Sequence, residues 1–93
     1  GGCLNAISRT IEITNKRGLH ARASAKFVNV ASGLTARIEV EKDGNKVVGT
    51  SIMGLMMLGA AMGDSITIHC QGDGCDAAME ELAALVEGRF GEE

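Results

Sequence analysis

Two short runs joined by Asp43-Gly44 restrict most strongly what this chain can fold into. From Thr35 to Glu41 apolar and polar residues alternate, as in a strand with one buried face. Asp-Gly between such runs is the strongest short-range signal for a tight β-hairpin, and residues 46–49 form the returning strand. The sequence therefore predicts an antiparallel hairpin. Its first strand has Ala36, Ile38 and Val40 facing inward and Arg37, Glu39 and Glu41 facing outward.

Further strands and helices are predicted along the rest of the chain. Alternation indicates strands over residues 8–13 and 65–71, and helical spacing of apolar residues indicates helices over 21–32, 51–58 and 75–87. Gly33 and Gly88 follow the first and last helices, where helices commonly end. The order strand-helix-strand-strand-helix-strand-helix predicts an α+β fold of two layers with a mostly antiparallel, four-stranded sheet. The inward face of helix 21–32 is predicted to comprise Ala21, Ala25, Phe27, Val28, Val30 and Ala31.

The length and composition indicate one small globular domain. The chain has 93 residues, of which 45% are hydrophobic, enough for one core and too few for two domains. We expect a single domain over 1–93, with an ordered part of about 8–87 and loose ends. The chain has no Trp or Tyr and only Phe27 and Phe90, so aliphatic residues, Ala and Met must form most of the core.

The charge and the apolar runs exclude several classes of function. A net charge of -3 argues against nucleic acid as a ligand, because proteins that bind the phosphate backbone are basic. No apolar run approaches the ~20 residues of a membrane span, and no basic-then-apolar start resembles a signal peptide. We therefore expect a cytoplasmic protein without membrane insertion.

The three cysteines, Cys3, Cys70 and Cys75, show no spacing typical of a metal site or a disulfide framework. Neither a metal nor another cofactor is expected. Cys70 is predicted to be a core residue of a strand. Cys75 lies near a predicted helix start, where a thiol can be mildly reactive, but we interpret it as structural.

The stretch from Gly18 to Arg22 joins a polar loop to a helix. His20 is placed where the first backbone N–H groups of the helix have no intrahelical partner, and such a terminus binds anions. An imidazole is substantially uncharged near neutral pH and can act as a nucleophile. Arg22 adds a planar cation suited to a phosphate. Together these residues predict phosphoryl transfer to the histidine itself.

The helix predicted over 51–58 begins at Ser51, a good N-cap, and places Leu55 and Leu58 inward. Met53, Met56 and Met57, with Ile52 beside them, then lie on another face. A core position is the alternative interpretation, but adaptable thioether side chains suit a docking surface, which we favour. Two other polar residues, Ser24 and His69, are predicted to face water. For Ser24 a local hydrogen bond near the bound phosphate is the alternative, and for His69 the pattern places no acid nearby.

Two motifs resemble one known family. Gly18-Leu19-His20-Ala21-Arg22, followed by Ala25 and Phe27-Val28, is similar to the active-site signature of the HPr family, the histidine-containing phosphocarriers of the bacterial phosphoenolpyruvate:sugar phosphotransferase system. Ser51-Ile52-Met53-Gly54-Leu55-Met56 with Leu58-Gly59 is similar to the second signature, around a regulatory serine. The resemblance extends over about residues 8–86 and implies an open-faced β-sandwich with strand order 1-4-2-3 and three helices on one face.

The resemblance also implies function. His20 would accept a phosphoryl group on Nδ1 from phosphorylated enzyme I and pass it to a histidine of an enzyme IIA, with Arg22 holding the phosphate. The protein would then be a stoichiometric carrier and not an enzyme, and a monomer fits that role. Ser51 would match a serine that a dedicated kinase and phosphorylase modify in some bacteria. The surface that docks both partners would comprise Leu19, Ala25, Ile52, Met53, Met56 and Met57.

The sequence departs from the family at two positions and leaves two alternatives open. Ala23 and Ser24 stand where the family usually has proline and alanine, and Ala23 restores a backbone donor in the first helical turn. Residues 12–16 and the acidic end after Phe90 look more like the nitrogen-related branch of the same system, whereas residues 51–59 look more like the sugar branch. A pure interaction domain that uses the Met-rich face without chemistry is the alternative of another class.

Overall fold

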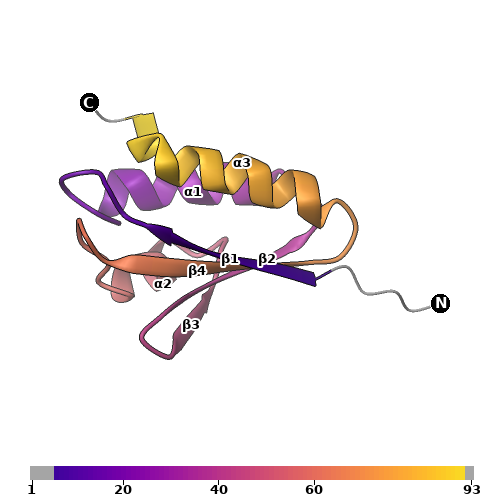
Figure 1. Cartoon of the computed structure of the whole chain (residues 1–93), viewed down its shortest axis with the longest axis horizontal. Helices are drawn as coiled ribbons and strands as arrows, with labels where there is room; N and C mark the ends of the chain where they lie inside the picture. Colours follow the sequence, from indigo (N-terminus) through magenta and orange to yellow (C-terminus); the bar gives the residue numbers. More distant parts are fainter. Residues whose placement is uncertain (1–5, 92–93) are drawn as a thin grey trace.

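The computed structural model describes residues 6–91, which form one four-stranded sheet and its helices (Figure 1). The strands are β1 (Ala6–Glu12), β2 (Arg37–Lys42), β3 (Asn45–Val48) and β4 (Ser65–Gln71). The helices are α1 (Ala21–Ser32), α2 (Ile52–Met57), α3 (Cys75–Glu87) and the short 3-10 helix η1 (Arg89–Gly91). The sheet order is β1-β4-β2-β3, and every neighbouring pair is antiparallel. This confirms the predicted fold and strand order.

The sheet has one face covered by helices and one open face. Figure 1 shows α1 and α3 side by side over one face, while α2 packs against α1 and β3. The β2–β3 turn has the expected hairpin form, because Asp43 (φ 52°) and Gly44 (φ 83°) both adopt the left-handed conformation of a type I′ turn. Ala36, Ile38 and Val40 are buried as predicted, so the alternation along β2 specifies which of its faces meets the helices.

The inward face of α1 differs in part from the prediction. Ala21 is exposed and Ala25 is only half-buried, because the buried side of the helix passes through Ala23 and Ser24 instead. Val28 and Val30 are also half-buried at the edge of the core. The fully packed positions of the helix are Ala23, Ser24, Phe27 and Ala31. The polar residue Ser24 therefore lies on the buried face of the helix, where the apolar periodicity did not predict it.

The chain end is more ordered than predicted. The sequence predicts a loose end after about residue 87, but residues 89–91 form η1, and Phe90 is fully buried. The side chain of Lys26 in α1 donates a hydrogen bond to the Phe90 carbonyl oxygen at 2.7 Å. This contact joins η1, which follows α3, to α1, and no local sequence pattern could indicate it. Glu92 and Glu93 lie outside the described residues.

Cys70 is buried in β4 as predicted, and Cys75 is buried at the first turn of α3. Burial raises the pKa of the Cys70 thiol, and the neighbouring Cys75 raises it further. The environment of Cys70 therefore favours the neutral, unreactive thiol of a structural cysteine. Cys3 lies outside the described residues. Within residues 6–91, no helix has the length and apolar composition needed to cross a membrane.

Candidate functional site

His20 is the N-cap residue of α1, as the sequence predicted. Its backbone is extended (φ -75°, ψ -177°), and its carbonyl oxygen accepts the first helical hydrogen bond, from the Ser24 amide at 2.9 Å. The ring Nδ1 accepts a hydrogen bond from the backbone N–H of Arg22 at 3.3 Å. The ring is half-exposed. A reachable imidazole thus directs one nitrogen lone pair toward the start of the helix.

Gly18 allows the loop before His20 to pass close to the chain that follows α2. Its φ is +62°, and a Cβ built on it would lie 2.3 Å from the Ala60 carbonyl oxygen. The Leu19 amide donates to that same oxygen at 2.9 Å. A side chain at position 18 would therefore be excluded both by the left-handed backbone and by the space. The contact joins the His20 loop to the segment after α2.

Two buried polar side chains hold the same loop. The amide Nδ2 of Asn15 donates to the Gly18 carbonyl oxygen at 2.9 Å, and the Ser24 hydroxyl donates to the Leu19 carbonyl oxygen at 3.2 Å. The prediction that Ser24 faces water is wrong, because Ser24 is fully buried and its side chain points back to the loop that enters the helix. A polar residue in the first turn of a helix commonly takes such a partner when a free carbonyl lies within reach.

Leu19 does not lie on the surface, and its prediction as a docking residue is wrong. Its side chain is only 4% exposed and belongs to the hydrophobic core. The loop is closed against Ala60 at this point, so the side chain of Leu19 turns inward while that of His20 remains reachable. Ala25, one turn into the helix, is half-buried and can contribute only part of its surface.

The first turn of α1 supplies the groups that an anion requires. The backbone amides of Ala21, Arg22 and Ala23 occupy the helix positions that have no intrahelical acceptor. The side chain of Arg22 is exposed and adds a cation in the same turn. Ala23 is buried, and its N–H is a donor that a proline at this place would lack. A dianionic group on Nδ1 of His20 would meet these donors and the positive end of the helix dipole.

The second motif has the local structure that was predicted. Ser51 is the N-cap of α2, and its Oγ accepts a hydrogen bond from the Gly54 amide at 3.0 Å. Leu55 and Leu58 are buried. Four apolar side chains of α2 are exposed, and Met53 (68%) and Met57 (80%) are the most open of them. We call the set the Met patch: Ile52, Met53, Met56 and Met57.

The Met patch and the His20 loop lie at the same end of the molecule. Figure 1 shows α2 and the start of α1 at the end opposite the N-terminus. The hydrogen bond between Leu19 and Ala60 links the two segments directly. A partner that approaches His20 can therefore contact the apolar side chains of α2 at the same time. The exposed position of the four side chains is confirmed, and their role in docking stays a prediction.

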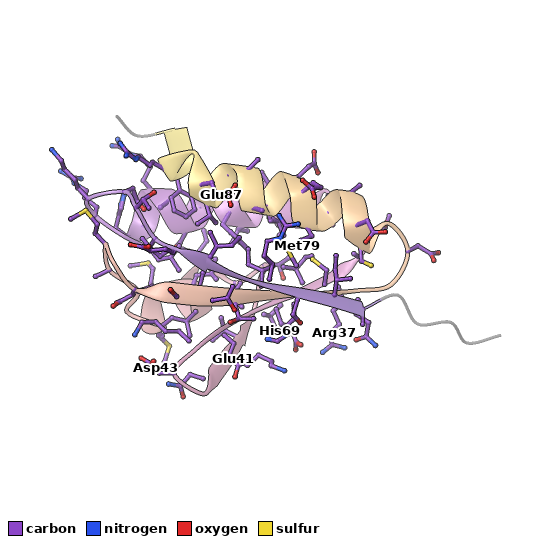
Figure 2. The ribbon with its side chains drawn as sticks, in the orientation of Figure 1. Arg37, Glu41, Asp43, His69, Met79 and Glu87 are labelled. Atoms are coloured by element: carbon purple, nitrogen blue, oxygen red, sulfur yellow. The ribbon has the colours of Figure 1, made fainter. Side chains whose placement is uncertain are left out.

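The prediction for His69 is wrong. The ring is only partly exposed, and its Nε2 lies 2.8 Å from Oε1 of Glu41, while its Nδ1 lies 2.8 Å from the Ser8 hydroxyl. The sequence pattern could not reveal these neighbours, because they come from β1 and β2, far from His69 in the chain. Figure 2 shows His69 and Glu41 on the open face of the sheet, away from α1 and α3.

Sequence reasoning also missed Asn15 and Ala60, which position the loop before His20. The sequence carries a weak signal for Asn15, since Asn followed three residues later by Gly is typical of a tight turn. The structure contains that turn, with the Gly18 amide donating to the Asn15 carbonyl oxygen at 3.2 Å. For Ala60 no local signal exists, because its contribution is a backbone carbonyl.

Comparisons with known proteins agree with this geometry. The family described as "PTS HPr component phosphorylation site" matches residues 7–88. The phosphocarrier protein HPr of Neisseria meningitidis serogroup A is 48% identical over 86 residues, which cover 92% of this chain and 97% of that protein. The phosphocarrier protein NPr of Shewanella violacea is 38% identical over 89 residues, covering 96% and 98%. A crystal structure of HPr from Thermoanaerobacter tengcongensis superposes with a TM-score of 0.89 at 47% identity, covering 94% of this chain and 98% of that one.

Proposed function

Because the chain belongs to the HPr family of phosphocarriers, we propose that it accepts a phosphoryl group on Nδ1 of His20 from phosphorylated enzyme I and passes it to a histidine of an enzyme IIA. The observation that carries the proposal is the hydrogen bond from the Arg22 amide to Nδ1 at 3.3 Å. A nitrogen that accepts a hydrogen bond is unprotonated, so its lone pair is the ring's nucleophile. That nitrogen also lies at the helix terminus where a phosphate is stabilised.

The transfer step requires little from the carrier itself. The Nδ1 lone pair attacks the phosphorus, an N–P bond forms, and the bond to the donor atom breaks with its electron pair remaining on the donor. The phosphoryl oxygens then take the first-turn amides of α1 as donors, in place of the contact between Nδ1 and the Arg22 amide. Arg22 shares the added negative charge. The same step in reverse, with an enzyme IIA histidine as nucleophile, releases the group.

The Met patch is proposed as the docking surface for both partners. A carrier must fit at least two proteins of different shape, and methionine side chains adapt to different surfaces. Two members of the patch, Met53 and Met57, are more than two-thirds exposed, and the underlying Leu55 is buried, so the patch can repack without disturbing the core. Ala25 contributes its half-exposed side of α1. A carrier must diffuse from one partner to the other, and a monomer in the cytoplasm suits this role.

Ser51 is proposed as a regulatory position that a serine kinase and phosphorylase modify. It caps α2 and directly precedes Ile52 and Met53, so a phosphate on its hydroxyl would place two negative charges beside the docking surface. This feature favours the sugar branch of the phosphotransferase system. The nitrogen-related branch is the second candidate, because a relative named NPr is 38% identical over nearly the whole chain.

Mass spectrometry tests the carrier function. The full chain is incubated with phosphoenolpyruvate and a catalytic amount of enzyme I, and its intact mass is measured before and after brief acid treatment. We expect one phosphoryl group per chain, lost in acid and absent from His20→Ala. NMR of the two histidine rings gives an internal reference, since only the His20 signals should move markedly. No added mass, or addition that persists in His20→Ala, would show a pure interaction domain or another acceptor.

The two branches differ in the protein that accepts the group from His20. The phosphorylated chain is therefore mixed with an enzyme IIA of the sugar branch and, separately, with one of the nitrogen-related branch. Faster loss of the phosphoryl group to the sugar-branch protein is the expected result. Preference for the other acceptor would assign the chain to the nitrogen-related branch.

A further inference from the structure

Three polar side chains on the open face of the sheet form a continuous hydrogen-bonded set. The Ser8 hydroxyl of β1 lies 2.8 Å from Nδ1 of His69 in β4, and Nε2 of His69 lies 2.8 Å from Oε1 of Glu41 in β2. Figure 2 shows His69 and Glu41 on the side of the sheet that α1 and α3 leave uncovered. We call these residues the Ser8–His69–Glu41 triad. None of them belongs to the His20 site.

The strand register holds the triad in place. Ser8 is directly opposite His69 in the β1–β4 pair, and Glu39 is directly opposite His69 in the β2–β4 pair. Glu41 is two residues further along β2 and therefore on the same face as Glu39. Ser8 is exposed, so its oxygen can be reached from solvent, whereas the His69 ring is largely covered. Three paired strands thus fix the order hydroxyl, imidazole, carboxylate.

The partners of His69 determine the direction of both hydrogen bonds when the ring is neutral. An ionised carboxylate can only accept, so Nε2 carries the hydrogen and donates it to Glu41. Nδ1 then has its lone pair free to accept, and the Ser8 hydroxyl donates to it. This is the arrangement of an activated serine, in which a base hydrogen-bonds to the nucleophile and a carboxylate orients the base.

A hollow beside the triad provides space for a small substrate. It measures about 220 Å³, and its lining includes Ser8, His69, two cationic residues, Arg37 and Lys46, and one acidic residue, Glu39. Arg37 and Lys46 bring positive charge to the hollow, where negative charge would develop on a carbonyl oxygen under attack. Arg37 also lies 3.7 Å from Glu39, which keeps that second carboxylate paired with a cation and not with His69.

We propose that Ser8 is a nucleophilic hydroxyl that takes an acyl group from activated acyl esters. The Ser8 oxygen attacks the carbonyl carbon and forms a new ester bond, while its proton passes to Nδ1 of His69. The bond from the carbonyl carbon to the leaving alkoxide or phenolate breaks, and the leaving group departs with that electron pair. The proton on His69 then goes to the leaving group or to water. The step needs no oxidant, reductant or metal.

The same strand pair contains a matched internal control. Thr10 lies two residues from Ser8 on the same face of β1, and its hydroxyl is 2.9 Å from the hydroxyl of Thr67. Thr10 is therefore exposed like Ser8, and its hydroxyl makes a hydrogen bond of similar length, but to a partner that is not a base. The ratio of the acylation rate at Ser8 to the rate at position 10 therefore measures the effect of His69 and Glu41. Because a threonine oxygen is more hindered than a serine oxygen, the comparison is made in a Thr10→Ser variant.

The test uses p-nitrophenyl acetate with the full-length chain. After a short incubation, tandem mass spectrometry of tryptic peptides 1–9 and 10–16 locates the acetyl group on Ser8, on position 10 or on Cys3. In Thr10→Ser, Ser8 should be acetylated at least about tenfold faster than position 10, because a positioned base typically contributes ~10²–10⁴-fold. Equal rates at the two positions would overturn the proposal.

Variants of the base and its carboxylate separate activation from mere exposure. His69→Gln should lower Ser8 acetylation to the level of position 10, and Glu41→Gln should lower it several-fold. Glu12→Gln, at an exposed carboxylate on the same face of β1 and outside the hollow, should leave the rate unchanged. Circular dichroism of each variant checks that the sheet is intact. Ser8 acetylation that is unaffected by His69→Gln in a folded chain would also overturn the proposal. Phosphorylation of His20 is measured separately and does not depend on either result.

Discussion

The hydroxyl of Ser24 donates a hydrogen bond to the carbonyl oxygen of Leu19 at 3.2 Å, and so connects the fourth residue of α1 to the residue directly before the N-cap His20. The same loop is held from its other side by the Leu19 amide, which bonds to Ala60. Both polar groups of the Leu19 backbone therefore have partners. His20 follows Leu19 directly and its side chain is half-exposed, so the orientation of its ring depends on these fixed groups.

Ser24→Ala should loosen this loop. The substitution removes the hydroxyl that pairs with the Leu19 carbonyl, and loss of one buried hydrogen bond costs about 1 kcal/mol of unfolding free energy. We also expect phosphoryl transfer from enzyme I to slow, because the Nδ1 lone pair is less well oriented. Urea unfolding and rapid-quench kinetics measure the two effects. Ser32→Ala, at the exposed last residue of α1, is the control. Identical stability and kinetics in Ser24→Ala would show that the contacts of Ala60 and Asn15 are sufficient to position the loop.

Arg22→Ala should slow transfer to and from His20 without lowering stability. Its side chain is exposed, so we expect about a tenfold loss, smaller than the ~10²–10³-fold effect of removing a buried donor to an oxyanion. Arg22→Lys should recover part of the rate, since it keeps the charge and loses the planar fork. Arg9→Ala, at an exposed pair with Glu80, is the matched control. Unchanged kinetics in Arg22→Ala with both partners would remove Arg22 from the transfer step.

Met53→Glu should weaken the binding of enzyme I while the melting temperature changes little. The side chain is 68% exposed, so its replacement does not open the core but puts a charge into the Met patch. Titration calorimetry with enzyme I measures the binding. Val48→Glu places the same charge at a half-exposed valine of β3, outside the patch, and should bind normally. Leu55→Ala gives the contrasting result, a loss of ~2–5 kcal/mol in stability, because Leu55 is fully buried. Unfolding of Met53→Glu would mean that Met53 supports the core.

Ser51→Asp and Ser51→Ala should change different properties, docking in the first and stability in the second. Aspartate can still accept from the Gly54 amide, so α2 should remain capped, whereas alanine loses the cap at a cost of about 1 kcal/mol. Only aspartate adds negative charge beside Ile52 and Met53, and we expect it to slow phosphorylation of His20 by enzyme I. Thermal unfolding and the phosphorylation rate measure the two properties. Equal phosphorylation rates in Ser51→Asp and the unmodified chain would argue against regulation at this serine.

Cys70 should make the stability of the fold depend on alkaline pH. Burial and the neighbouring Cys75 raise the pKa of its thiol above the ordinary value of 9.0. A raised pKa in the folded state means that this stability is fully present below the unfolded pKa and is lost as the pH rises toward the folded pKa. The unfolding free energy should therefore fall more steeply above about pH 9 in the unmodified chain than in Cys70→Val. Parallel pH profiles in urea unfolding would contradict this.

Local pattern predicted the elements well where the signals lie within a few residues of one another. The bounds of α1, α3 and β4 match the predicted ranges 21–32, 75–87 and 65–71. The Gly18-Leu19-His20 junction marks the start of α1, and glycines mark the ends of both helices. Strict alternation marks the extent of the strand. The cap of α2 by Ser51 and the turn at Asp43-Gly44 were predictable for the same reason. The position of His20 at a helix start belongs to this group.

Three residues could not be placed in this way, and each depends on a neighbour from elsewhere in the chain. Leu19 turns inward because Ala60 closes the loop beside it. Ser24 is buried because a free carbonyl and the core lie on its side of the helix. His69 contacts the Ser8 hydroxyl and the Glu41 carboxylate only because β4 lies between β1 and β2 in the sheet.

The amino-acid order alone was thus sufficient to set the secondary structure, the hairpin, the exposed methionines and the histidine at a helix terminus. Propensity, capping and periodicity act over a few residues, and these features require nothing more. Which polar side chains are buried, which backbone oxygens hold the His20 loop and which acid meets His69 were decided by the packing of distant segments. Such contacts form between residues far apart in the chain, 61 positions for Ser8 and His69 and 64 for Lys26 and Phe90, and no interaction between sequence neighbours specifies them.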